Sequence, residues 1–254
     1  MTASPGLTHE FWIEPADYQP QIGDPLVAHI RNGENFKGGS LAFFDSNIAR
    51  FEIWQNGQSA PVEGRMGDIP VLETRAEDAG LVVLVHQTTP SRLTYRTWAK
   101  FQKFADHKDF PGIRARHDAR GLPEADFVET YTRFAKSLIA IGDGSGTDVD
   151  TGLETEFVAL ANPYQADLSG GMPVRLLYRG APRPDAQIEM FDKAPDGSVQ
   201  VRLYRTDARG EAVLPVTPGH SYLLDAVVLR PVEGQAPVVW ETLWAALTFA
   251  VPAR

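Results

Sequence analysis

The sequence predicts an all-β protein made of two β-sandwiches with a helical insertion between them. Two observations carry this prediction. The 254 residues include 22 Gly and 19 Pro, a high density of turn-forming residues. Between the turns lie many short runs rich in Val, Ile, Leu, Phe and Tyr, which is the composition of β-strands. A hydrophobic fraction of 43% and a charged fraction of 22% are typical of a folded protein with a core.

The N-terminal region alternates strand patterns with turns. Residues 25–32 alternate apolar and polar side chains, as a strand with one buried face does. Asn56-Gly57 is a strong hairpin turn signal. Turns recur about every 8–12 residues, which is typical of an immunoglobulin-like or prealbumin-like sandwich. The strands expected here are residues 9–15, 25–32, 49–57, 70–76 and 80–89.

The pattern changes to a helical one at about residues 95–130. Trp98, Phe101 and Phe104 recur at helical spacing with charged residues between them, which predicts an amphipathic helix. Pro123, followed by acidic residues, is a candidate start for a second helix. The insertion is therefore expected to be helical.

Two sandwich domains are expected on either side of a linker. Residues 133–142, "RFAKSLIAIG", favour a strand that rejoins the first sandwich over a continued helix, which assigns residues 9–142 to the first domain. Residues 143–152 are rich in Gly, Ser, Thr and Asp and predict a flexible linker. Residues 153–254 repeat the pattern of strands and turns and form the second domain.

Composition excludes several functions. A formal net charge of −9 gives no basis for nucleic-acid binding, which needs clustered Lys and Arg. The absence of cysteine excludes thiol catalysis, thiolate metal sites and disulfides. No run of about 18 apolar residues predicts a membrane span. No nucleophile elbow or acid–base pair stands out, so we expect a protein that is not an enzyme.

Several stretches, in this order along the chain, resemble one bacterial family of unknown function. That family is described as the periplasmic component of cobalt/nickel ABC-type transport systems. The resemblance implies a periplasmic, non-catalytic binding protein that holds Ni²⁺ or Co²⁺, or a chelate of the metal, and that works with a membrane transporter. Residues 1–7 lack the features of a signal peptide, which leaves a cytoplasmic location open. The stretches are "HEFWIEP" (9–15), "GENFKGG" (33–39), "AKFQKF" (99–104), "RFAKSL" (133–138), "LLYRGAPRPDAQIEMF" (176–191), "TDARGEAVLP" (206–215) and "WETLWAALTF" (240–249).

Candidate metal ligands are His9, Glu10 and His86. Without cysteine, a nickel or cobalt site needs imidazole nitrogen and carboxylate or carbonyl oxygen. None of the six histidines are paired at helical spacing, so a site requires residues from distant strands. His9 and Glu10 open the first strand, and His86 ends an apolar one. The alternative for His9 is a solvated strand end, and for His86 a histidine held by a backbone carbonyl at a sheet edge.

Two other functions remain open. A structural or interaction module without metal predicts that the histidines do not converge. A binder of small organic ligands or glycans predicts an exposed aromatic surface, whereas aromatic residues at these spacings more often pack in the core. The residues concerned are Trp98, Phe101, Phe104, Trp240 and Trp244. Four cations within or near the resembling stretches are expected to form a buried or cleft-lining charge cluster: Arg50, Lys100, Arg133 and Lys136.

Overall fold

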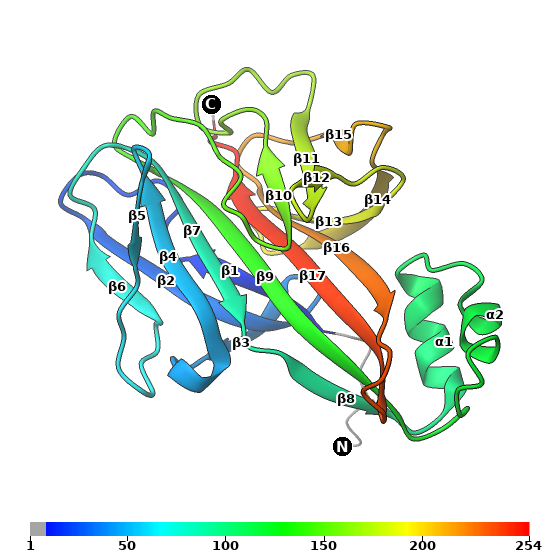
Figure 1. The fold of residues 1–254 in the computed structure, drawn as a ribbon. Coiled ribbons are helices and arrows are strands. Elements are labelled where there is room, and N and C mark those ends of the chain that lie inside the picture. Colours follow the sequence, from blue (N-terminus) through cyan, green and yellow to red (C-terminus); the bar gives the residue numbers. More distant parts are fainter. Residues whose placement is uncertain (1–8, 254) are drawn as a thin grey trace.

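The computed structural model describes residues 9–253, and it confirms an all-β fold with one helical insertion (Figure 1). Within these residues the strands form one long sheet of nine strands and two smaller sheets of four strands each. The prediction that residues 1–7 lack a signal peptide concerns a segment outside the described residues.

The first small sheet comes from the N-terminal region. Its order is β1-β2-β3, and β6 pairs with the other part of β2. All pairings are antiparallel, as expected for strands joined by tight turns. A short 3-10 helix, Asp45–Asn47, leads from this sheet to the long one. The four strands are β1 (Glu10–Pro15), β2 (Pro25–Glu34), β3 (Lys37–Leu41) and β6 (Leu72–Arg75).

The long sheet runs through both halves of the chain. Its order is β14-β13-β16-β17-β9-β7-β4-β5, and β8 pairs with the start of β9. β9 and β17 pair in parallel, and they lie side by side along the centre of the molecule (Figure 1). The strands are β4 (Ile48–Gln55), β5 (Gln58–Pro61), β7 (Gly80–Thr88), β8 (Ser91–Tyr95), β9 (Phe127–Ile141), β13 (Gln187–Lys193), β14 (Val199–Arg205), β16 (Ser221–Pro231) and β17 (Val238–Ala250).

The second small sheet belongs to the C-terminal half. β11 is its centre and pairs antiparallel with the other three strands. These are β10 (Thr155–Ala159), β11 (Met172–Tyr178), β12 (Ala181–Pro182) and β15 (Glu211–Leu214).

The two small sheets cover opposite faces of the long sheet. Side chains of a strand alternate between its faces. On β9, Phe134 and Leu138 pack in the core under the second small sheet, whereas Ala135 and Ile139 pack in the core under the first. Each half is therefore a sandwich, and both sandwiches use the same central sheet. The division into domains of residues 9–142 and 153–254 stays a prediction. The two halves are joined by backbone hydrogen bonds between β9 and β17.

The helical insertion covers the remaining part of one face of the long sheet. It consists of α1 (Trp98–His107) and α2 (Ile113–Asp118). The aromatic face of α1 packs into a third apolar cluster with Trp240 and Trp244 of β17. Neither helix of residues 9–253 has the length and apolar composition needed to cross a bilayer.

The second helix does not begin at Pro123, so that prediction was wrong. Residues 127–141 form the single long strand β9, which confirms the strand expected at residues 133–142 and extends it towards the N-terminus. Its central position leaves it covered on both faces over most of its length. A strand covered on both faces loses the simple alternation of polar and apolar residues, which is why its period was ambiguous.

Residues 143–152, predicted to be a flexible linker, are fixed to the long sheet. Lys136 of β9 forms an ion pair with Asp148, with 2.8 Å between Nζ and Oδ1, and donates to the carbonyl oxygen of Val149. Asn162 donates to the carbonyl oxygens of Gly144 and Gly146. Polar composition predicted mobility here, but the polar groups instead find partners in the fold.

Candidate functional site

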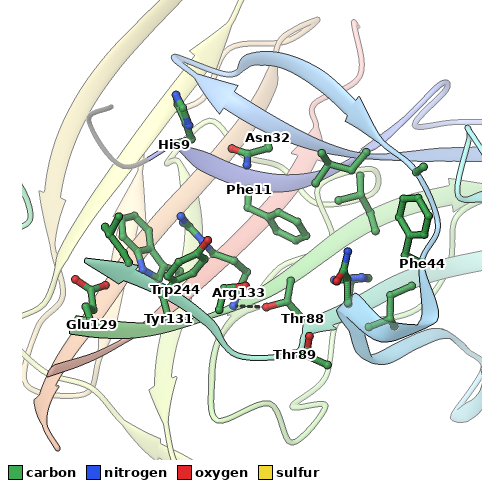
Figure 2. A pocket seen from close by; sticks show the side chains of 18 residues that line it. His9, Phe11, Asn32, Phe44, Thr88, Thr89, Glu129, Tyr131, Arg133 and Trp244 are labelled. Carbon is green, nitrogen blue, oxygen red and sulfur yellow. Dashed lines mark hydrogen bonds between the residues drawn. The ribbon is translucent and has the colours of Figure 1, made fainter. Parts of the chain in front are cut away.

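A cavity of about 470 Å³ lies between the first small sheet and the long sheet. Figure 2 shows Arg133, Tyr131 and Trp244 at one end of it, Phe44 at the other and Phe11 between them. The residues that line the cavity are His9, Phe11, Ile30, Asn32, Leu41, Ala42, Phe44, Asn47, Ile48, His86, Thr88, Thr89, Ser91, Leu93, Glu129, Tyr131, Arg133 and Trp244.

A change of partner along β9 creates the polar end of this cavity. β7 pairs with β9 from Phe134 onwards, and β8 pairs with it only up to Tyr131. At the break, the backbone N–H of Arg133 donates to Oγ1 of Thr88 at 3.0 Å (Figure 2). Because alternate residues of a strand share a face, Glu129, Tyr131 and Arg133 all face the cavity.

Arg133 is held in place by aromatic rings. Its guanidinium carbon lies 4.0 Å from the ring centre of Trp244 and 5.3 Å from that of Tyr131. Burial lowers the pKa of Arg133, but a guanidinium stays protonated in proteins. Within residues 9–253, Nη1 of Arg133 has no hydrogen-bond partner. The cavity thus has a fixed positive charge with a free donor.

Glu129 is a buried carboxyl group beside Arg133, with 1% of its surface exposed. One oxygen accepts a hydrogen bond from Oγ1 of Thr242, and the hydroxyl group of Tyr95 also interacts with the carboxyl group. Burial raises the pKa of Glu129 to about 7. The group therefore changes charge near neutral pH and can either donate or accept a hydrogen bond.

His86 lies at the inner wall of the cavity between two phenylalanine rings. Its ring centre is 5.4 Å from that of Phe11 and 5.2 Å from that of Phe51, and only 2% of the residue is exposed. Burial lowers the pKa of His86 to about 3, so the imidazole is neutral at neutral pH. Neither ring nitrogen has a partner within the described residues. The expected backbone carbonyl partner is therefore absent from residues 9–253.

The structure brings two of the three predicted metal ligands to this cavity. His9 and His86 both line it. The side chain of His9 is half exposed, and its Nε2 lies 3.4 Å from Oε1 of Glu34. Glu10 does not line the cavity, because it follows His9 in an extended strand and points to another side. Residues 9–253 contain no group of three or more side chains placed to hold a metal ion.

Glu10 instead faces a buried charge network. Nζ of Lys108, just after α1, donates at 2.8 Å to both Oε2 of Glu189 and Oδ2 of Asp225. His107 reaches the other oxygen of Glu189 at 3.0 Å. Burial, with the negative charges of Asp225 and Glu189, raises the pKa of Glu10 to about 7 although Lys108 lowers it. Sequence reasoning missed this network; the available signal was Asp225, a lone charge within an apolar strand.

The other histidines hold the fold together or lie near the surface. Nε1 of Trp240 donates to Nδ1 of His117 at 3.1 Å, and Nε2 of His117 lies 2.9 Å from the carbonyl oxygen of Pro123, which ties α2 to the sheet. Nδ1 of His220 lies 2.6 Å from Asp192, and Nδ1 of His29 lies 3.2 Å from the Ser40 hydroxyl.

The four cations singled out in the sequence do not form one cluster. Arg133 faces the cavity, Lys136 lies buried on the opposite face of β9, and Lys100 is exposed on α1. Arg50 pairs with Glu52, with 2.7 Å between Nη2 and Oε2. The expectation of a cleft-lining charge holds for Arg133, and that of a buried charge holds for Lys136.

The sequence matches, over residues 7–230, the family described as a domain of unknown function, DUF4198. The chain belongs to this family. The description of the DUF4198 family assigns no function, so the association with nickel or cobalt transport stays a prediction. No curated protein matches the sequence.

Two solved structures resemble this DUF4198 chain weakly. The D0-D1 domain of intimin is 13% identical, with 95% of this chain and 97% of that one covered and a TM-score of 0.19. Dimeric latent PorU from Porphyromonas gingivalis is 11% identical, with 92% and 20% covered and a TM-score of 0.19. The chain thus spans about a fifth of PorU. At these TM-scores neither likeness carries an argument.

Glu129→Gln is expected to stabilise the protein at alkaline pH. The folded state keeps a proton on Glu129 between about pH 4.5 and 7, whereas the unfolded state does not. The contribution of protonated Glu129 to the free energy of unfolding is therefore complete below pH 4.5 and is lost as the pH rises through 7. Glutamine imitates the protonated form. The free energy of unfolding of the variant, relative to that of the parent, should therefore rise by on the order of 1–3 kcal/mol from pH 5 to pH 8.

Urea unfolding at pH 5 and pH 8 measures this difference. Glu73→Gln is the control, because Glu73 is exposed on β6. The same stability difference between Glu129→Gln and the parent at both pH values would contradict the assignment of a raised pKa to Glu129.

Proposed function

We propose that this protein is a non-catalytic binding protein that holds a small organic molecule in the cavity between the first small sheet and the long sheet. Small-molecule sites are concave and mostly apolar, with a few polar groups that fix the orientation of the ligand. This cavity has that composition: Phe11, Phe44 and Ile48 supply apolar wall, and Glu129 and Arg133 supply polar groups at one end.

The unpartnered polar atoms at the cavity carry the proposal. Buried polar groups in folded proteins almost always have hydrogen-bond partners, because leaving one without a partner costs about 1–3 kcal/mol. Two residues that line this single cavity hold such atoms among the described residues: His86 with both ring nitrogens, and Arg133 with Nη1. A bound molecule would supply partners for groups that residues 9–253 leave without one.

Ligand-observed NMR with a library of small organic fragments tests the proposal. Ala42→Phe places a ring in the cavity from its wall, and Ala60→Phe adds the same ring on exposed β5 as the matched control. We expect fragments to bind the parent protein and Ala60→Phe and to lose binding in Ala42→Phe. If no fragment distinguishes the two variants, the cavity is not the binding site.

A metal chelate is the second candidate, favoured by the two histidines at the cavity. A neutral imidazole is a common ligand of nickel and cobalt, and both nitrogens of His86 are free within the described residues. Two histidines without a third group do not provide the ligand set of a bare ion. We propose that in this case an organic acid already holds the metal and an imidazole of the cavity wall completes its coordination.

Calorimetric titration of the tag-free protein with Ni²⁺ alone and with the Ni²⁺–citrate complex tests this candidate. We expect heat of binding from the complex but not from the free ion, and loss of that heat in His86→Phe. Export and contact with a membrane transporter remain predictions from the family resemblance.

A further inference from the structure

Among the described residues, Arg133 differs from Lys108, Lys136, Arg50 and Arg230 in having no carboxylate within ion-pair distance. Lys108 binds two carboxylates, Lys136 binds two, and Arg50 and Arg230 are each paired with glutamates. Within residues 9–253, Nη1 of Arg133 is buried without a hydrogen-bond partner. Arg133 as a whole is half-buried, but leaving a buried N–H of a charged group without a partner is costly, so its retention at a cavity points to a ligand.

The surroundings of Arg133 orient its guanidinium for binding. The guanidinium carbon of Arg133 lies 4.0 Å from the ring centre of Trp244, and Nζ of Lys108 lies 4.8 Å from the same ring centre. The strand backbone is held by Thr88. A guanidinium fixed in this way loses little freedom when it forms two parallel hydrogen bonds to a planar anion.

Nearby carboxyl groups limit the charge of that anion. Glu129 lies on the same strand as Arg133, and the charges of Asp225 on β16 and Glu10 on β1 also act on Arg133. Lys108 offsets Asp225 and Glu189. A single negative charge balances Arg133, whereas a second one would be repelled by these groups. This favours a carboxylate over a phosphate dianion.

The rest of the cavity fits an apolar body. Leu41, Phe44 and Leu93 line it and are among the exposed large hydrophobic residues of the described chain, at 40%, 40% and 38% exposure. Phe11 and Ile48 continue the apolar wall inwards. An elongated molecule can thus cover these side chains while its charged end reaches Arg133.

We propose that the ligand is an organic monocarboxylate, whose carboxylate binds the Arg133 guanidinium and whose apolar body lies along Phe11, Leu41 and Phe44. This inference rests on the proposed function and names the chemical class of the ligand. Glu129 lies beside the same end of the cavity and can hydrogen-bond to a hydroxyl or second oxygen of the ligand.

Three matched pairs of probes test the inference on the unmodified protein: benzoate and benzamide, 3-phenylpropanoate and 3-phenylpropanamide, octanoate and octanamide. Each pair differs in charge and keeps the apolar body. Affinity is measured by calorimetry and ligand-observed NMR. We expect at least one carboxylate to bind at least about tenfold more tightly than its amide, because a hydrogen bond to a charged group is lost.

Variants then locate the carboxylate. Arg133→Gln should reduce the preference for carboxylate to near unity, and Arg133→Lys should restore part of it. Arg92→Gln removes the same charge from β8 at an exposed position that does not line the cavity and should keep the preference. Circular dichroism checks that each variant folds, and the comparison of acid with amide needs no variant.

The outcomes separate this inference from the proposed function. Equal binding of acid and amide, or a preference that survives in Arg133→Gln, overturns the carboxylate assignment and leaves the cavity as a binding site. Failure of all six probes to bind counts against both proposals. A tenfold preference that disappears in Arg133→Gln and persists in Arg92→Gln supports both.

Discussion

Replacing Lys136 with methionine is expected to lower the free energy of unfolding by about 3–5 kcal/mol. Lys136 is 1% exposed, and its Nζ lies 2.8 Å from Oδ1 of Asp148 and 3.1 Å from Oε2 of Glu156. It also donates to the carbonyl oxygens of Val149 and Phe157. Methionine fills a similar volume but leaves two buried carboxylates without their cation, and it detaches residues 143–152 from the sheet.

Urea unfolding followed by tryptophan fluorescence and by circular dichroism measures the loss, and coincident curves establish that unfolding is two-state. Lys100→Met on the exposed face of α1 is the control. Adding Asp148→Asn and Glu156→Gln to Lys136→Met should recover part of the stability, because no buried charge is then left alone. A loss below about 1 kcal/mol for Lys136→Met would show that these ion pairs contribute little to the free energy of unfolding.

His86→Phe is expected to remove a large part of the acid sensitivity of the fold. In the folded protein the pKa of His86 is about 3, against 6.5 as its ordinary value, because burial disfavours the imidazolium. The unfolded chain therefore binds a proton between pH 6.5 and pH 3 that the folded chain does not. The stability from neutral His86 is complete above pH 6.5 and is lost as pH falls through this window.

The size of the effect follows from the shift in pKa. Between pH 6.5 and pH 5 the contribution of His86 should fall by about 1.5 kcal/mol, and at the acid limit by on the order of 5 kcal/mol. Phenylalanine does not titrate and matches the neighbouring rings of Phe11 and Phe51. The free-energy difference between His86→Phe and the parent should thus grow in favour of the variant as pH falls.

Stability measured in urea at pH 7, 6 and 5 gives that difference directly. His86→Leu repeats the test with a smaller side chain, so an effect of packing can be distinguished from one of charge. His9→Gln changes the other histidine of the cavity, whose side chain is half exposed, and serves as the control. A difference between His86→Phe and the parent that stays constant from pH 7 to pH 5 would falsify the neutral, buried assignment of His86.

Much of the local structure could be predicted because it depends on neighbouring residues. Alternation in residues 25–32, the Asn56-Gly57 turn and the helical spacing of Trp98 and Phe101 are properties of short segments, and each element formed as expected. β9 was harder, since a strand covered on both faces carries no clear period, and the predicted helix at Pro123 was wrong for that reason.

The candidate site could be predicted only in part. His9 and His86 reach the same cavity, but Glu10, adjacent to His9 in sequence, faces the network around Lys108 instead. Strand alternation alone would have separated His9 from Glu10, and it would have grouped Glu129 with Arg133 on one face. Nothing local indicates that Trp244, more than a hundred residues away, lies against Arg133.

The sequence by itself determined the all-β class, the helical insertion and most turns, because these follow from residue type and short-range periodicity. Only the tertiary structure decided that β9 and β17 pair in parallel, that residues 143–152 are fixed by Lys136, and that Arg133 reaches the cavity with an Nη1 that has no partner in residues 9–253. Each of these depends on contacts between distant segments. Such contacts are selected by burial and charge pairing in the assembled core, which no local pattern records.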